Sequence, residues 1–247
     1  MRTKALVISV ALMLPAGIAY AGTGCPSGTD GPDEIYCSSD DDVHEGNPGN
    51  DLVVGRSGDD HLRGGEGNDR IYGDGGMDVL VGDFGSDRLY GGPRSDSLAG
   101  FAGNDVLDGS TGADALAGGA GRDQIDGGPE DDEANGGNGI DRLAGGDGDD
   151  LLTGGRDEDL IYGDAGLDRL FGGIGPDEVY AGDGDDYVRP GAGIDVVLAG
   201  GGNDSIEAVD GQRDHIRCGE GSDRVVADAA DRVAPSCEVV EEAADQP

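Results

Sequence analysis

The sequence of 247 residues predicts an all-β solenoid, because a nine-residue pattern recurs along most of its length. Writing the chain in blocks of nine from residue 28 to residue 207 gives 20 consecutive blocks without an insertion. The sixth position of the block is Asp in all 20, the eighth is Val, Ile or Leu in 18, and the fourth is Gly in 16. Self-similarity at such a short fixed period is typical of a solenoid, in which each repeat packs only on its neighbours.

Charge and composition allow two descriptions of the chain. It has 53 Asp and Glu residues against 16 Lys and Arg, a formal net charge of −37, 51 glycines and no Trp. A negative surface of this size repels a polyanion, which excludes nucleic-acid binding. Few large apolar residues and a large single-sign charge are typical of disorder, whereas the other description is a fold neutralised by bound cations. The regular order of the residues favours the second.

Each position of the block has a physical role in such a solenoid. In GGEGNDRIY (residues 64–72) and GGAGRDQID (residues 118–126), the glycines allow positive φ angles and close approach of neighbouring loops. Positions seven to nine form a short strand whose eighth residue points inward. One aliphatic side chain per block makes a thin core, and stacked aspartates repel one another. A hard divalent cation with oxygen ligands resolves both problems.

The block resembles the nonapeptide G-G-x-G-x-D-x-U-x of the repeats-in-toxin family, the hemolysin-type calcium-binding repeat. The resemblance covers most of the chain in a single register. It implies a parallel β-roll solenoid of about twenty in-register nonapeptide repeats, two per turn. It also implies that multiple calcium ions lie between successive turns, so that calcium is both the cofactor and the determinant of the fold.

The same resemblance implies the calcium ligands. Each ion is expected between a block and the next block but one, bound by the position-six aspartates of both and by backbone carbonyls of the glycine-rich loops. Aspartates 18 residues apart, such as Asp51 and Asp69, therefore share an ion, with a ceiling of 18 ions for 20 blocks. The predicted metal ligands are Asp33, Asp51, Asp60, Asp69, Asp78, Asp87, Asp105, Asp114, Asp123, Asp141, Asp150, Asp168, Asp177, Asp186, Asp195 and Asp204.

Four blocks lack the position-four glycine, and their aspartates are left out of this prediction. A side chain is not expected to adopt the glycine-only conformation, and Arg94 could replace an ion by its own charge. The replacing residues are Asp40, Arg94, Glu130 and Asp157, which precede Asp42, Asp96, Asp132 and Asp159.

The first residues have the pattern of a secretory signal peptide. Arg2 and Lys4 precede an apolar run over residues 5–14, and a small-x-small site over residues 19–21 predicts cleavage after Ala21. The run is too short to span a membrane. We therefore expect a secreted, extracellular protein whose processed chain has a formal charge of −39.

Four cysteines lie in two close pairs, one near each end of the chain. Cys25, Cys37, Cys218 and Cys237 allow three pairings in an oxidising compartment, and the local one, 25–37 with 218–237, is the most economical. A zinc site needs C-x-x-C spacing or nearby histidines, which these pairs lack. Disulfide-stapled ends are the better interpretation.

These features give the predicted organisation: a signal peptide at residues 1–21, an N-terminal cap with degenerate repeats at 22–45, the calcium-binding roll at 46–207, and C-terminal irregular repeats with a cap at 208–247. The segment 208–217 has one extra residue, which moves its aspartate to Asp214, and Asp223 resumes the motif. Terminal repeats of a solenoid are atypical because they cover its exposed ends.

An enzyme is not predicted. The three histidines fall outside any zinc-protease motif, no G-x-S-x-G motif occurs, and the repeat accounts for the acidic residues. Ice binding would need a regular Thr or Asn ladder, but positions three and five of the blocks are mixed.

Five of the seven tyrosines fall on one expected face of the roll, at position nine of alternate blocks: Tyr36, Tyr72, Tyr90, Tyr162 and Tyr180. Stacking between successive turns explains them, and a strip that binds a polysaccharide or another surface is the alternative.

The sequence thus predicts a secreted calcium-binding repeat protein with a structural, adhesive or surface-binding and glycan-binding role, whose partners are calcium and a polysaccharide or cell-surface component. An accessory module or folding partner of an extracellular protease, lipase or polysaccharide-modifying enzyme is the alternative.

Overall fold

Two parallel β-sheets of twelve strands each form the molecule in a computed structural model that describes residues 24–242. The odd sheet consists of β1 (Glu34–Tyr36), β3 (Leu52–Ser57), β5 (Arg70–Gly75), β7 (Arg88–Pro93), β9 (Val106–Thr111), β11 (Gln124–Pro129), β13 (Arg142–Asp147), β15 (Leu160–Ala165), β17 (Glu178–Asp183), β19 (Val196–Gly201), β21 (His215–Glu220) and β23 (Arg232–Val233). The even sheet consists of β2 (Val43–His44), β4 (His61–Glu66), β6 (Val79–Phe84), β8 (Ser97–Ala102), β10 (Ala115–Ala120), β12 (Glu133–Asn138), β14 (Leu151–Arg156), β16 (Arg169–Ile174), β18 (Tyr187–Ala192), β20 (Ser205–Ala208), β22 (Arg224–Ala227) and β24 (Val239–Glu242).

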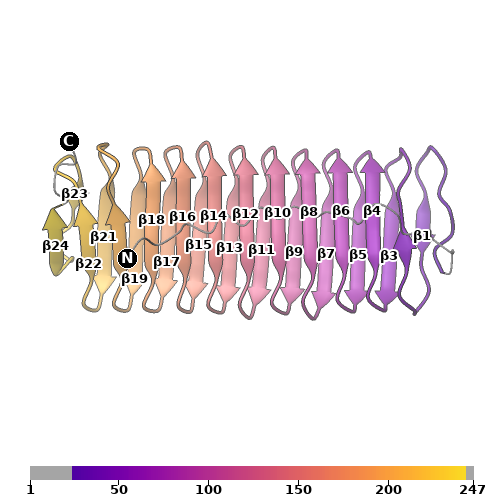
Figure 1. The fold of residues 1–247 in the computed structure, drawn as a ribbon, viewed down its shortest axis with the longest axis horizontal. Helices are drawn as coiled ribbons and strands as arrows, with labels where there is room; N and C mark the ends of the chain where they lie inside the picture. The colour runs from indigo at the N-terminus through magenta and orange to yellow at the C-terminus, as the bar shows by residue number, and fades with distance from the viewer. Residues whose placement is uncertain (1–23, 243–247) are drawn as a thin grey trace, which may run out of the picture.

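Successive strands alternate between the two sheets, so that each turn of the chain adds one strand to each sheet (Figure 1). Through most of the chain every residue pairs with the residue 18 positions later, as Tyr72 pairs with Tyr90. The predicted parallel β-roll with two blocks per turn is confirmed. Its strands number 24, because the C-terminal segment adds β21 to β24 beyond the 20 regular blocks. The described residues contain no helix and therefore no helical membrane span.

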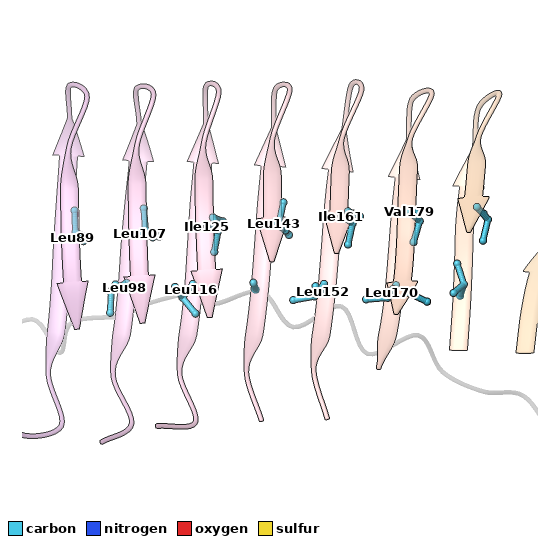
Figure 2. Close-up of a cluster of buried hydrophobic side chains, with 14 of the residues drawn as sticks. Leu89, Leu98, Leu107, Leu116, Ile125, Leu143, Leu152, Ile161, Leu170 and Val179 are labelled. Carbon is cyan, nitrogen blue, oxygen red and sulfur yellow. The ribbon is translucent and has the colours of Figure 1, made fainter. Parts of the chain in front are cut away.

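A ladder of position-eight side chains fills the space between the sheets (Figure 2). Leu89, Leu98 and Leu107 are each at most 1% exposed, and their neighbours along the axis repeat this arrangement. Residues at positions seven and nine point outward, which gives most strands an alternating burial pattern; Val81 in β6 and Ala99 in β8, both at position nine, are also buried. His44 occupies position eight of its block in place of an aliphatic residue, and it is also buried. Burial lowers the pKa of its imidazole, which favours the neutral form in this apolar interior.

The turns stack so closely that most rungs use glycine at position four. A methyl group built on Gly103, whose φ is 149°, would collide with the carbonyl oxygen of Gly85 in the preceding turn. Arg94, Glu130 and Asp157 occupy the same position with φ of 83°, 80° and 76°. As expected, these three residues do not adopt the glycine-only conformation; their backbone moves to the left-handed region that L-residues can enter, and the turn is kept.

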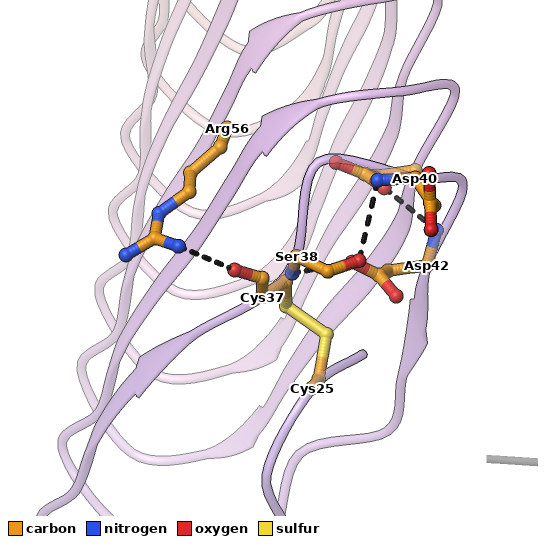
Figure 3. Close-up of a disulfide and its surroundings, with 7 residues drawn as sticks. Cys25, Cys37, Ser38, Asp40, Asp42 and Arg56 are labelled. Atoms are coloured by element: carbon orange, nitrogen blue, oxygen red, sulfur yellow. Dashed lines mark hydrogen bonds between the residues drawn. A yellow bond between two sulfur atoms is a disulfide. The ribbon is translucent and has the colours of Figure 1, made fainter. Parts of the chain in front are cut away.

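Both ends of the roll carry the predicted disulfides, Cys25–Cys37 and Cys218–Cys237. At the first end, Arg56 donates a hydrogen bond to the carbonyl oxygen of Cys37 at 3.0 Å (Figure 3). The backbone N–H and hydroxyl of Ser38 donate to Asp42 at 2.7 and 2.9 Å. The first turn has no earlier turn to pack against, and it is held instead by the disulfide, by the bonds from Ser38 to Asp42, and by Arg56 of the next turn.

Tyrosine rings on the outer face of the odd sheet stack on one another between turns. The Tyr72 and Tyr90 rings lie 4.8 Å apart at 7°, and the Tyr162 and Tyr180 rings lie 4.9 Å apart at 13°. The Arg142 guanidinium lies 4.4 Å from the centre of the Tyr162 ring. The rings of each pair face each other, so this geometry supports stacking as the explanation of the tyrosine pattern.

Candidate metal centre

Two columns of buried carboxylates run the length of the roll, one along each row of turns. Asp69 and Asp105 are at most 1% exposed, and the position-six aspartates from Asp42 to Asp204 are all buried. The two columns follow from the parallel register, because residues 18 positions apart occupy equivalent places in successive turns. The structure thus brings together the sixteen predicted ligands, although Asp33 at the first rung is not fully buried.

One oxygen of each carboxylate is used within the protein. The backbone N–H of Asp51 donates to Oδ1 of Asp69 at 2.8 Å, and the N–H of Asp69 donates to Oδ1 of Asp87 at 2.8 Å. The same hydrogen bond recurs without a break along both columns, from Asp33 and Asp42 onward. Each Oδ1 therefore fixes the carboxylate to the turn before it.

The other oxygen has no partner. Nineteen buried aspartates have an Oδ2 atom that is inaccessible to solvent and accepts no hydrogen bond within the described residues: Asp60, Asp69, Asp78, Asp87, Asp96, Asp105, Asp114, Asp123, Asp132, Asp141, Asp150, Asp159, Asp168, Asp177, Asp186, Asp195, Asp204, Asp214 and Asp223. A buried, unpaired carboxylate oxygen is costly unless a proton or a cation compensates it.

The unpartnered oxygen lies beside the first glycine of its block. A methyl group built on Gly100 would collide with Oδ2 of Asp105 and would lie 2.7 Å from the carbonyl oxygen of Gly118 in the next turn. The same two kinds of oxygen flank Gly109 and Gly136. A carboxylate and a carbonyl oxygen from adjacent turns thus lie close together where a side chain is missing.

Burial raises the pKa of most carboxyl groups in the middle of the two columns. The pKa reaches about 6 for Asp69 and Asp105, about 7 for Asp60 and about 8 for Asp159. The N–H donated by the preceding turn lowers each pKa, and neighbouring carboxylates raise it, but removal from water dominates. The arrangement therefore strongly favours neutralisation of the carboxylate charge, and a bound cation provides it at neutral pH.

The donor set fits calcium. Hard oxygen ligands from carboxylates and backbone carbonyls are those that Ca²⁺ prefers, and soft thiolate or imidazole ligands are absent from the two columns. Bound ions would neutralise the unpaired Oδ2 atoms and connect one turn to the next. Cys25, Cys37 and Asp42 also lie close enough to form a metal cluster, but the two sulfurs are joined in a disulfide and offer no thiolate.

Sequence reasoning omitted several residues that have the same geometry. Asp96, Asp132 and Asp159 carry an unpartnered Oδ2 like their neighbours, although position four of their blocks is not glycine. The Arg94 guanidinium lies 3.9 Å from Asp59 instead of beside Asp96, so it does not replace an ion there.

The columns also continue into the irregular C-terminal segment. The N–H of Asp195 donates to Asp214, and the N–H of Asp214 donates to Asp231, both at 2.9 Å. In the other column, Asp204 donates to Asp223, which donates to Glu238 at 3.0 Å. The spacing changes from 18 to 19 and then to 17 or 15 residues, and therefore the period alone identifies neither Asp231 nor Glu238.

Comparison with known families agrees with this geometry. A family model described as "RTX calcium-binding nonapeptide repeat (4 copies)" matches overlapping segments that together cover residues 45–197, more than half of the chain. The chain belongs to the RTX calcium-binding nonapeptide repeat family. As a member of the RTX repeat family, it binds multiple calcium ions in a β-roll.

Other comparisons give little beyond the RTX repeat family. No curated protein matches the chain. Among solved structures, the chain is similar to a hyperactive, Ca²⁺-dependent, β-helical antifreeze protein from an Antarctic bacterium. The identity is 20%, the TM-score is 0.33, and the match covers 82% of this chain and 78% of that one.

Proposed function

We propose that this protein is an exported calcium-binding roll that folds when it meets calcium outside the cell and then serves as a rigid structural or adhesive element. The columns of unpartnered, buried Oδ2 atoms carry this proposal. Without cations, carboxylates stacked in a dry interior repel one another, whereas calcium joins each turn to the next. The predicted ligands, extended by Asp96, Asp132 and Asp159, are the residues that we assign to calcium.

Calcium sites differ along the roll in what fills the space beside the carboxylate. Position one is glycine in β3 through β16, but the buried residues Ala181, Pro190 and Ala199 occupy it in β17 to β19. By the register of the sheets, their side chains lie beside the carboxylate, where the other rungs have only the hydrogen of a glycine. We therefore expect the strongest calcium sites beside the glycines and weaker ones at Asp186, Asp195 and Asp204.

An extracellular location is supported by two independent features. Both disulfides close within the terminal segments, as is typical of an oxidising compartment. Calcium outside cells is abundant enough to fill sites of modest affinity, whereas cytosolic calcium is not. The predicted signal peptide lies in residues 1–21, outside the described residues, and it gives the expected route of export.

The role at the cell exterior is binding or scaffolding and not catalysis. The carboxylates of the two columns are buried and committed to the backbone of adjacent turns, which leaves them unsuited to meet a substrate. An accessory module or folding partner of an extracellular enzyme would use the same rigid faces, and a co-purifying hydrolase would favour that second role.

Cell fractionation tests the location. The full-length chain, expressed in a host with a general secretion pathway, should lose residues 1–21 and accumulate outside the cytoplasm with both disulfides formed. Deleting residues 2–21 should retain it inside. An uncleaved, reduced chain that remains in the cytoplasm would contradict the proposal.

A further inference from the structure

A hollow of about 350 Å³ opens on the outer face of the even sheet, near its C-terminal end. Side chains of Phe171, Arg189, Glu207, Val209 and Asp210 line it, together with backbone of β16 and β18. Its size is at the lower end of the range of small-ligand pockets in proteins. It lies outside both carboxylate columns, so calcium binding does not explain it.

The wall of the hollow follows from the one extra residue in the segment 208–217. Asp210 accepts hydrogen bonds from the backbone N–H groups of Gly193, at 2.9 Å, and Gln212, at 2.7 Å. These bonds tie the irregular segment to the neighbouring turn and leave Val209 46% exposed beside the sheet. The departure from the repeat thus produces a fixed edge beside an otherwise flat strand face.

The floor of the hollow is preorganised. The Tyr187 hydroxyl donates to Glu207 at 2.7 Å, while the Phe171 ring lies 5.9 Å from the Tyr187 ring at 58°. Burial and Glu207 raise the pKa of Tyr187, which keeps its phenol protonated as a donor. Arg189 makes no hydrogen bond or ion pair within residues 24–242, so its guanidinium donors remain available to a ligand.

The tyrosine strip on the odd sheet offers a poorer binding surface than this hollow. Tyr72 and Tyr90 stack face to face, as do Tyr162 and Tyr180, so one face of each ring is covered by its partner. In contrast, Phe171 lines a concavity next to an unpaired arginine and a carboxylate. An aromatic ring flanked by hydrogen-bonding side chains suits a sugar, which has apolar C–H groups and hydroxyls.

We infer that this hollow binds a neutral sugar residue of an extracellular polysaccharide, with Phe171 contacting the C–H face of the ring and Arg189 and Glu207 hydrogen-bonding its hydroxyls. The inference rests on the proposed role at the cell exterior and names its ligand class. Glu207, Asp210 and the formal net charge of −37 disfavour an anionic sugar at this site.

Affinity electrophoresis in calcium tests the inference, with native gels that contain a neutral glucan, galactan or mannan, and dextran sulfate as the charged comparison. At least one neutral polymer should retard the wild-type protein. Phe171→Ala and Arg189→Gln should each weaken that retardation at least tenfold without moving the midpoint of calcium-induced folding, whereas dextran sulfate should not retard the protein.

Matched controls remove the same side chains elsewhere. Phe84→Ala, at an exposed phenylalanine at the end of β6, and Arg88→Gln, on the odd sheet, should leave the retardation unchanged. Persistence of binding in both hollow variants, with its loss in the Tyr72→Ser/Tyr90→Ser double variant, would overturn the hollow as the site but leave the exterior role intact. Failure of every neutral polymer to bind would also overturn the inference, whereas failure of secretion would overturn the exterior role.

Discussion

The rungs β3 to β16 and the rungs β17 to β22 share one register but differ at a single buried position. In the first group, position one of the block is glycine, and Oδ2 of the aspartate lies where a side chain at this position would collide with it. In the second group that position is occupied by buried residues: Ala181, Pro190, Ala199, Ala208, Cys218 and Ala227. The same fold is therefore built in two ways, one that depends on cations and one that adds apolar packing.

The difference shows how a thin solenoid obtains its stability. Each additional buried methyl group contributes about 0.8 kcal/mol of hydrophobic stabilisation. In the last rungs, apolar packing therefore supplies part of the stabilisation that we assign to calcium in the middle rungs. Carbon cannot neutralise a carboxylate, however, and Asp186, Asp195 and Asp204 retain an unpartnered Oδ2. We expect the C-terminal rungs to fold at a lower calcium concentration than the middle rungs. Protonation of their carboxylates is the alternative to a bound ion.

Acid should replace calcium, and this is the largest effect that we expect. The folded-state pKa of these aspartates, about 6 to 8 at Asp69, Asp60 and Asp159, exceeds the ordinary value of 3.8. Between pH 4 and 8 the folded chain therefore binds more protons than the unfolded chain, and its stability falls as the pH rises. In chelator, far-UV circular dichroism should show β-structure increasing as the pH drops from about 8 to about 5. Loss of β-structure on acidification would contradict the raised pKa values.

Adding a methyl group to a middle rung should be the next largest effect. Gly100→Ala places a carbon against Oδ2 of Asp105 and the Gly118 carbonyl, so we expect about 3 kcal/mol of destabilisation in calcium. The stoichiometry measured by calorimetry should also fall. Gly211→Ala is the control, because no heavy atom lies within 4 Å of the new carbon and only its positive φ costs about 1 kcal/mol. Equal losses in both variants would remove the distinction between the two kinds of position.

A pair of charge-removing substitutions sharpens the comparison between the two groups of rungs. Asn retains the oxygen that accepts the backbone N–H of Asp87 but removes the charge, so Asp105→Asn should weaken the calcium transition by about tenfold, or about 1.4 kcal/mol. Asp195→Asn likewise keeps the acceptor for the N–H of Asp177, and it should have a smaller effect, since Pro190 occupies the space beside it. A larger loss at Asp195 would reverse the assignment of strong and weak sites.

The tyrosine stack should give the smallest effect. Tyr90→Ser removes one ring of a pair at 4.8 Å and should cost about 1 kcal/mol in thermal unfolding with calcium present. Calcium stoichiometry should be unchanged, because the ring lies on the outer face of the odd sheet. A change in stoichiometry would show that the outer face is coupled to the carboxylate columns.

The nine-residue period was sufficient to predict the strands and the position-eight core. The two-block turn and the two columns of aspartates were predicted from the resemblance to the repeats-in-toxin family, and the disulfide pairing from the closeness of the cysteines in each pair. The period could not predict that one oxygen of each carboxylate is consumed by the preceding turn, because that hydrogen bond depends on the stacking of turns in space. Nor could it predict that the turns at Arg94, Glu130 and Asp157 are kept, because their backbone φ shifts by several tens of degrees relative to the glycines.

The end of the chain was harder to predict because hydrogen bonds, and not spacing, define its rungs. Asp231 and Glu238 continue the two columns at spacings of 17 and 15 residues, where the sequence pattern has already ended. The hollow beside Phe171 arises from the same irregularity. Sequence reasoning pointed to the tyrosines on the opposite sheet because a repeat pattern identifies regular features more readily than a single extra residue.

A calcium titration of residues 22–247 with intact disulfides tests the central claim most directly, with circular dichroism reporting folding and calorimetry reporting stoichiometry. We predict a cooperative transition from coil to β-structure at neutral pH with roughly ten or more ions bound. A chain that is already folded in chelator at neutral pH and binds only one or two ions would contradict the claim that calcium neutralises the buried columns and holds the turns together.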